Sequence, residues 1–187
     1  MFAPINCKTH FSLLRGFSKP EELAKKCKEY GYSSCVLADM NTISGAIAFH
    51  KACKNNDIKP IIGCDFGNYL LIAKNKDGWF DLIKCVSDQS IDTLKDVSKN
   101  KNLLCISGKV NGLASLFKNN FVQYDYQKDA VYYVEKEDAE CHRILLCSSM
   151  KTTLPQAMQK IKNDQIDPET KVFFTSDDFY LKKPVKY

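Results

Sequence analysis

Short apolar runs alternate with segments of helical periodicity along the first third of the chain. The run Ser34–Ala38 is almost wholly apolar, which is typical of a strand covered on both faces. Similar runs at Ala3–Cys7 and Ile58–Phe66 predict two further strands. Between these runs, apolar residues recur at spacings of three and four, which indicates two helices. Strand, helix, strand, helix and strand with short links predict parallel βαβ units.

The first of these helices carries start and stop signals. Ser18–Glu21 fits a capping box with a proline in the first turn: Ser18 would accept from the Glu21 N–H, and the Glu21 carboxylate would reach back. Gly31 is placed to end this helix. The second helix is predicted over Gly45–Asn55.

The second half of the chain gives a coarser pattern of the same kind. Strands are predicted over Tyr69–Ala73, Leu103–Ser107, Ala130–Val134 and Lys171–Thr175. Helices are predicted over Gly78–Ser87, Leu113–Lys118, Glu137–Cys147 and Thr153–Lys162. No internal repeat, low-complexity tract or linker divides the chain, so we expect one α/β domain.

The composition narrows the class of protein without indicating a function. With 187 residues and 44% hydrophobic content, the chain can bury a core without disulfides or metal. A net charge of +5 is compatible with a nucleic-acid neighbour but does not indicate one. Nine cysteines with no Cys-x-x-Cys pair predict reduced, mostly buried thiols. The sequence lacks signal-peptide features and any apolar run near the ~20 residues that span a bilayer, so we expect a cytoplasmic protein without membrane contact.

Several segments, met in order along the chain, resemble the PHP (polymerase and histidinol phosphatase) domain. In that family a strand ends in a His-x-His pair, and an aromatic-Ser-Leu-Leu-x-Gly turn follows; the turn stands here as Phe11–Gly16. Leu37–Ala46 resembles the second motif, and Ile58–Phe66 resembles the strand that ends in an acidic ligand. Leu70–Trp79 and Tyr133–His142 resemble later pieces of the version found in the alpha subunit of bacterial-type replicative DNA polymerase III, family C.

This resemblance implies a fold and a division of the chain. The fold would be a distorted parallel (βα)7-type barrel, TIM-like and shortened between Gly108 and Ala130. Residues 1–178 would form the PHP-like domain. Residues 179–187 would be an exit segment toward a polymerase core, or the end of a fragment.

The sequence departs from the family at most of its metal-ligand positions. Asn6 and Lys8 stand where the first motif has histidines, and Asp39 and Asp65 alone keep the expected residue type. An ammonium group cannot ligate a divalent cation before it loses its proton, and an Asn carbonyl is a weak ligand for zinc. In the family a histidine stands at the position of Met40, and an Asp and a His stand at those of Ala130 and Tyr132. The resemblance thus implies these vestigial metal-site positions: Asn6, Lys8, Asp39, Met40, Asp65, Ala130 and Tyr132. We expect no catalytic residues and no cofactor, with Zn, Mn or Fe as the alternative.

The roles of single polar residues near the metal-ligand positions are predicted one by one. His10 follows the ligand position by two residues on the outgoing loop, so we expect a solvated loop histidine, with metal ligation beside Asp39 and Asp65 as the alternative. Asp39 is expected to stabilise its loop by accepting backbone N–H groups around Asn41. Lys8 could pair with Asp39 or Asp65 and replace a missing metal charge. The remaining histidines, His50 and His142, are expected at the surface or at an interface.

These observations favour a degenerate, non-catalytic PHP domain that is a structural and interaction module of a polymerase III alpha subunit in DNA replication. The expected partners are the polymerase core of the same subunit, a proofreading exonuclease or another replisome subunit, and DNA only indirectly. The sequence assigns no DNA-binding residues. One rival is an active metal-dependent phosphoesterase or 3′–5′ exonuclease. The other is a free-standing protein that binds DNA or the replisome.

Overall fold

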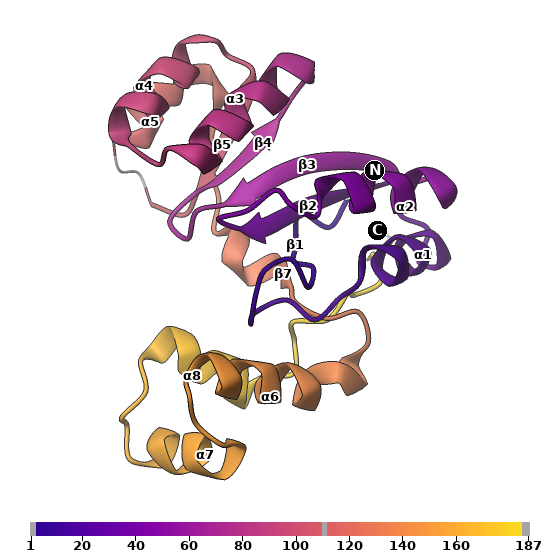
Figure 1. Cartoon of the computed structure of the whole chain (residues 1–187), viewed down its shortest axis with the longest axis vertical. Coiled ribbons are helices and arrows are strands. Elements are labelled where there is room, and N and C mark those ends of the chain that lie inside the picture. The colour runs from indigo at the N-terminus through magenta and orange to yellow at the C-terminus, as the bar shows by residue number, and fades with distance from the viewer. Residues whose placement is uncertain (1–2, 110–111, 185–187) are drawn as a thin grey trace.

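A computed structural model describes residues 3–109 and 112–184 of the chain. Over these residues one sheet of seven strands has the order β6-β5-β4-β3-β2-β1-β7. The strands are β1 (Asn6–Cys7), β2 (Ser34–Met40), β3 (Lys59–Asp65), β4 (Leu70–Ala73), β5 (Leu103–Ser107), β6 (Phe121–Gln123) and β7 (Ala130–Val131). Figure 1 shows the long strands β2 and β3 at the centre of the molecule.

Most neighbouring strands are parallel, as the alternating pattern predicts. β1, β2 and β3 run parallel to one another, and β7 runs parallel to β1. β4 is antiparallel to β3, from which only a short turn separates it, and it is also antiparallel to β5. β6 returns parallel to β5. The α/β class with a mostly parallel sheet is therefore confirmed, but β6 and β7 are the outer strands of the order and the sheet is not closed into a barrel.

The helices fall into three groups along the sheet (Figure 1). The first pair lies beside β1–β3, the next three lie beside β4 and β5, and the last three form a separate layer below the sheet in this view. The α-helices are α1 (Pro20–Glu29), α2 (Ala46–Asn55), α3 (Lys76–Ser87), α4 (Ile91–Lys99), α5 (Leu113–Phe117), α6 (Ala139–Ser149), α7 (Leu154–Lys162) and α8 (Pro168–Thr175). Short 3₁₀ turns are η1 (Lys118–Asn120), η2 (Tyr126–Asp129) and η3 (Lys136–Asp138). No helix within the described part of the chain has the length and apolarity that crossing a bilayer requires.

The two faces of the sheet are covered in different ways. One face packs on α1 and α2 through residues such as Cys7 and Leu37, and farther along on α3–α5 through Leu71 and Cys105. Strand alternation sends the intervening side chains to the opposite face. There the apolar cluster is Val36, Ala38, Leu70, Ile72 and Ile106, and no helix covers it among the described residues; the ring of Tyr126 from η2 packs on it.

Eight of the nine cysteines are buried, as expected for small apolar side chains, and Cys141 is exposed. Four of them (Cys7, Cys27, Cys35 and Cys53) belong to the core between the sheet and α1 and α2. They fill volume in the core that positions the ends of β1 and β2.

Two predicted features are wrong. Lys171–Thr175 belongs to a helix, α8, which Asp167 caps by accepting from the Thr170 N–H at 2.8 Å. The Ser18 capping box does not form, because Lys19 is the N-cap residue and no side chain caps this helix. Ser18 is instead buried, and its backbone carbonyl accepts from the His10 N–H.

Candidate functional site

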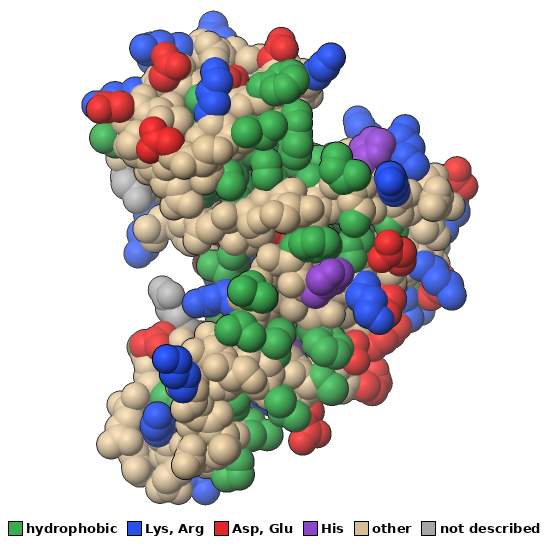
Figure 2. Space-filling view, in the orientation of Figure 1, with side chains coloured by type: hydrophobic (Ala, Val, Ile, Leu, Met, Phe, Trp, Pro, Cys, Tyr) green, Lys and Arg blue, Asp and Glu red, His purple; other side chains and the backbone are tan. Residues whose placement is uncertain are grey.

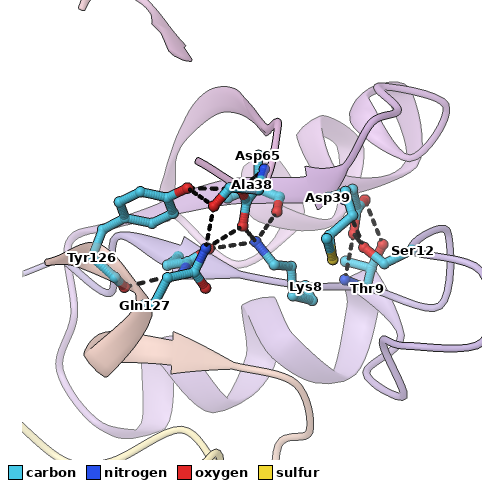
Figure 3. A network of polar contacts seen from close by, with 11 residues as sticks. Lys8, Thr9, Ser12, Ala38, Asp39, Asp65, Tyr126 and Gln127 are labelled. Carbon is cyan, nitrogen blue, oxygen red and sulfur yellow. Dashed lines mark hydrogen bonds and ion pairs between the residues drawn. The ribbon is translucent and has the colours of Figure 1, made fainter. Parts of the chain in front are cut away.

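Three charged side chains meet at the carboxyl ends of neighbouring parallel strands. Lys8 follows β1, Asp39 lies near the end of β2, and Asp65 ends β3. The register places Met40 beside Asp65, so the strand ends lie level. All three side chains are 0% exposed. Figure 3 shows Lys8 directed toward Asp65, with Asp39 in a second group of contacts beside it.

The Lys8 ammonium has a complete set of acceptors. Its Nζ donates to Asp65 Oδ2 at 2.7 Å, and also to Asn6 Oδ1 and the Ala38 carbonyl. Three acceptors match the three N–H groups of an ammonium, whereas a neutral amine offers only two. Burial lowers the pKa of Lys8, and the charges of Asp65 and Asp39 oppose that shift. The geometry is that of a cation, and the predicted pairing of Lys8 with one of the two carboxylates is confirmed for Asp65.

Asp65 is also held by groups from distant parts of the chain. Its Oδ1 accepts from the Tyr126 hydroxyl at 2.8 Å and from the Gly67 N–H at 2.7 Å. Gln127 Nε2 reaches Oδ2 at 3.3 Å. Both carboxylate oxygens are therefore already hydrogen-bonded, and one of them carries the ion pair with Lys8.

Among the described residues, Asp39 has no cation in hydrogen-bond contact and is held by neutral donors. Its Oδ1 accepts from the Thr9 N–H at 2.6 Å and from the Ser12 hydroxyl at 2.6 Å, and its Oδ2 accepts from the Thr9 hydroxyl at 2.8 Å. Burial raises the pKa of Asp39, and the Ser12 and Thr9 hydrogen bonds oppose the rise. The expectation that Asp39 accepts from the backbone around Asn41 is wrong; its donors come from the loop after β1.

Two glycines of the motif segments have steric reasons to be glycine. A Cβ at Gly16 would lie 2.0 Å from the Thr9 carbonyl oxygen, and one at Gly45 would lie 2.9 Å from Asp39 Oδ2. A larger residue at Gly16 would displace the backbone of Thr9, and one at Gly45 would press on the Phe11 ring and the Asp39 carboxylate. The turn at 11–16 and the start of α2 are thus built closely around Asp39.

The remaining sequence-predicted positions lie outside these contacts. His10 is exposed, as expected for a loop histidine, and stacks on Phe11 with ring centroids 4.4 Å apart. Met40 contributes its backbone N–H to the Ser12 hydroxyl at 3.1 Å. Ala130 is buried in β7 beside Asn6. Tyr132 is buried in an aromatic cluster with Phe173 and Phe179.

His142 is buried, which corrects the expected surface position; His50 is exposed as predicted. The His142 side chain is 1% exposed, lies against Tyr132 and Tyr133, and has Nε2 2.9 Å from the Arg15 carbonyl oxygen. A carbonyl only accepts, so Nε2 carries the proton and donates. Burial lowers the pKa of His142 to about 4, so the ring is neutral near pH 7.

Four residues of the network have no role in the predictions from sequence: Thr9, Ser12, Tyr126 and Gln127. Ser12 lies in the motif turn at Phe11–Gly16, so its role as a donor to the carboxylate of Asp39 could have been predicted from the sequence. Tyr126 and Gln127 are about sixty positions from Asp65 and lie in no motif, so no local pattern points to them. Within the described residues, no three His, Cys, Asp or Glu side chains are grouped so that they could hold a metal ion.

Comparison with known families decides the classification. The sequence profile of the PHP domain matches residues 5–153 of the chain. The chain belongs to the PHP domain family. This PHP segment contains every residue of the network around Lys8, Asp39 and Asp65, whereas α7 and α8 follow it.

Similar proteins carry polymerase names. The PHP chain is 34% identical to the DNA polymerase III subunit alpha of Aquifex aeolicus over 139 residues, which are 74% of this chain and 11% of that protein. It is 31% identical to the DNA polymerase III subunit alpha of Chlamydia trachomatis over 56% of this chain and 8% of that protein. An error-prone DNA polymerase of Alkalilimnicola ehrlichii is 32% identical over 46% of this chain and 9% of that protein.

The chain therefore spans only about a tenth of the length of these relatives. Among solved structures, one from Bifidobacterium adolescentis superposes on 97% of this chain and 58% of its own with a TM-score of 0.40 and 14% identity, too remote a likeness to add to the classification.

Proposed function

We propose that this PHP domain is non-catalytic and is a structural and interaction module of a DNA polymerase III alpha-type subunit. The observation that carries the proposal is the buried Lys8–Asp65 ion pair, because the ammonium stands at a position where the family resemblance expects a metal-ligating histidine. The Asp65 carboxylate forms an ion pair with Lys8, and the Asp39 carboxylate accepts hydrogen bonds from Thr9 and Ser12.

The donor set does not fit a divalent cation. A catalytic metal site needs several carboxylate or imidazole ligands with free lone pairs at bonding distance and one open position for water or substrate. Here the candidate ligands are two carboxylates engaged in hydrogen bonds and the Asn6 amide, whose oxygen accepts from Lys8. Bringing an ion to Asp65 would place it against a buried ammonium, which repels it. The vestigial positions Ala130 and Tyr132 offer no ligand in this network, since one is a methyl and the other packs among aromatic rings.

The replication role follows from the relatives, whose names are those of polymerase subunits. In this proposal residues 1–178 form the domain, residues 179–187 lead toward a polymerase core, and the protein acts in the cytoplasm. The first residues of this exit segment are bound to the domain. The Phe179 carbonyl accepts from the Tyr132 N–H at 2.8 Å, and Leu181 is 1% exposed. The polymerase core is then the first partner, and a proofreading exonuclease is the second.

Metal analysis tests the non-catalytic part. The purified chain is incubated with Zn²⁺, Mn²⁺ or Fe²⁺, desalted, and assayed for bound metal and for hydrolysis of bis-p-nitrophenyl phosphate and of single-stranded DNA from its 3′ end. We expect less than a stoichiometric ion and no turnover above a boiled sample. Stoichiometric metal with turnover that Asp65→Asn abolishes would overturn the proposal in favour of an active phosphoesterase or exonuclease.

The size of the native polypeptide tests the replication part. An antibody against this chain should detect, in cells that express it, a polypeptide of polymerase size that co-purifies with DNA synthesis activity. A single band at the 21.3 kDa of this chain would instead support a free-standing protein.

A further inference from the structure

The open side of the sheet lies between β6 and β7, the strands that a closed barrel would pair. The chain crosses from one to the other through residues 124–129, which include η2. Among the described residues, the backbone hydrogen bonds of this crossing are turn bonds of its own plus one from the Tyr124 N–H to the Ser107 carbonyl. Beyond Tyr124, sheet pairing therefore does not hold the crossing in place.

Side chains hold it instead. The Tyr126 ring is 2% exposed and, among the described residues, packs on the sheet face that no helix covers, in one buried cluster with Val36, Leu70 and Ile106. Its hydroxyl donates to Asp65 Oδ1 at 2.8 Å and lies 3.1 Å from the Gly67 carbonyl, and its own carbonyl accepts from Asn6 Nδ2 at 3.1 Å. Figure 3 shows Tyr126 and Gln127 reaching the strand ends from one side, opposite the Asp39 group.

Two of these contacts, those with Asp65 and Asn6, involve groups that Lys8 also binds. Asp65 and Asn6 are the groups on the sheet that bind the crossing, and Lys8 donates to both of them. Without the ammonium, Asp65 would be a buried carboxylate supported only by neutral donors, and the Asn6 amide would lose the contact that orients it. The cation thus fixes the two acceptor and donor groups that Tyr126 needs.

We infer that Lys8, Asp65, Asn6 and Tyr126 form a latch that ties the β6–β7 crossing across the open side of the sheet, with the ammonium as an internal cation in place of a bound metal. Side-chain hydrogen bonds then connect this crossing to the sheet, whereas in a closed barrel backbone pairing would connect the two outer strands. The inference rests on the proposed non-catalytic role, because an ion at Asp65 would displace the ammonium.

The test is hydrogen exchange measured by mass spectrometry on the whole chain, with matched tyrosine variants. Tyr126→Phe removes only the hydroxyl of the latch. Tyr124→Phe is the control, because Tyr124 lies two positions away on the same crossing and its hydroxyl bonds the exposed Asp129 at the surface. We expect peptides over residues 122–131 to exchange roughly five- to tenfold faster in Tyr126→Phe. The control and the peptides of α4 should stay unchanged.

Equal exchange over residues 122–131 in the two tyrosine variants would overturn the latch. Lys8→Met tests the cation and should speed exchange in the same peptides at least as much as Tyr126→Phe. If that variant does not fold, the neutral double variant Lys8→Met/Asp65→Asn takes its place with the same expectation, and full protection in either variant would remove the cation from the latch. All samples are treated with a chelator, so metal uptake, which would overturn the proposed function, is scored in a separate assay.

Discussion

Lys8 and His142 are two buried basic side chains in contact with the loop between β1 and α1: Lys8 is its first residue, and His142 donates to the Arg15 carbonyl. Lys8 is 0% exposed and has a carboxylate and two further oxygens as acceptors, whereas His142 is 1% exposed among aromatic rings with one carbonyl. The first keeps its charge because a counter-charge is buried with it. The second loses its charge because none is. Burial alone therefore does not decide protonation; the neighbouring groups do.

The largest expected effect comes from removing the charge of Lys8. Lys8→Met keeps the length and apolar stem but leaves Asp65 uncompensated, which should lower the free energy of unfolding by about 3–5 kcal/mol. The double variant Lys8→Met/Asp65→Asn should recover part of this loss, since no buried charge remains. Urea denaturation of the three proteins measures both effects. A single variant as stable as the parent would break the comparison, because Lys8 would then need no counter-charge.

The second-largest expected effect is a loss of stability when a fall in pH protonates His142 in the unfolded chain. Its folded pKa of about 4 lies below the ordinary value of 6.5, so between these values the unfolded chain binds a proton that the folded chain does not. Stability is therefore full above pH 6.5 and is lost as the pH falls toward 4, by up to about 3 kcal/mol. Urea midpoints of the parent and of His142→Phe between pH 7 and 4.5 measure this contribution. Parallel pH profiles for the two proteins would contradict it.

A smaller loss is expected at Asp39, which has hydrogen bonds where Asp65 has a cation. Ser12→Ala removes one donor to the carboxylate and the acceptor of the Met40 N–H, and should cost about 1–3 kcal/mol in denaturation. Ser44→Ala is a matched control, because Ser44 is exposed and bonds Thr42 at the surface. Equal stability of the two alanine variants would mean that Ser12 is dispensable to Asp39.

The smallest effect is expected at His10, the exposed basic side chain of the same loop. His10→Ala removes a stacking contact with Phe11 and should change stability by no more than about 0.5 kcal/mol. A thermal melt with and without added Zn²⁺ measures it. A larger loss, or a zinc-dependent rise in melting temperature that the variant lacks, would return His10 to the list of ligands.

The first half of the fold was predictable because its signals are local. The apolar run after Ser34 and the helical spacing of Gly45–Asn55 give β2 and α2 with small shifts of their ends. α8 was mistaken for a strand because Val172, Phe173 and Phe174 favour strands, although Asp167 followed by a proline is a helix start. α4 was missed although Ser90 caps it by accepting from Thr93.

The candidate site was predictable only in part. Strand-end carboxylates at Asp39 and Asp65 follow from motif position, and the pairing with Lys8 follows from placing an ammonium among them. The choice of Asp65 over Asp39 depends on strand register and on Tyr126, which reaches the site from a distant crossing. Such long-range contacts leave no periodic trace in the sequence. His142 was misplaced because its partners Tyr132 and Phe173 come from separate segments.

The two edge strands of the sheet, β6 and β7, affect how readily copies of the protein associate by strand pairing. β6 has three residues and β7 has two, and beyond β7 the backbone at Tyr133 bridges Tyr180. Strand addition between molecules needs a long row of free amide and carbonyl groups. These edge strands offer too few, so the incomplete barrel exposes little template for aggregation even at high concentration.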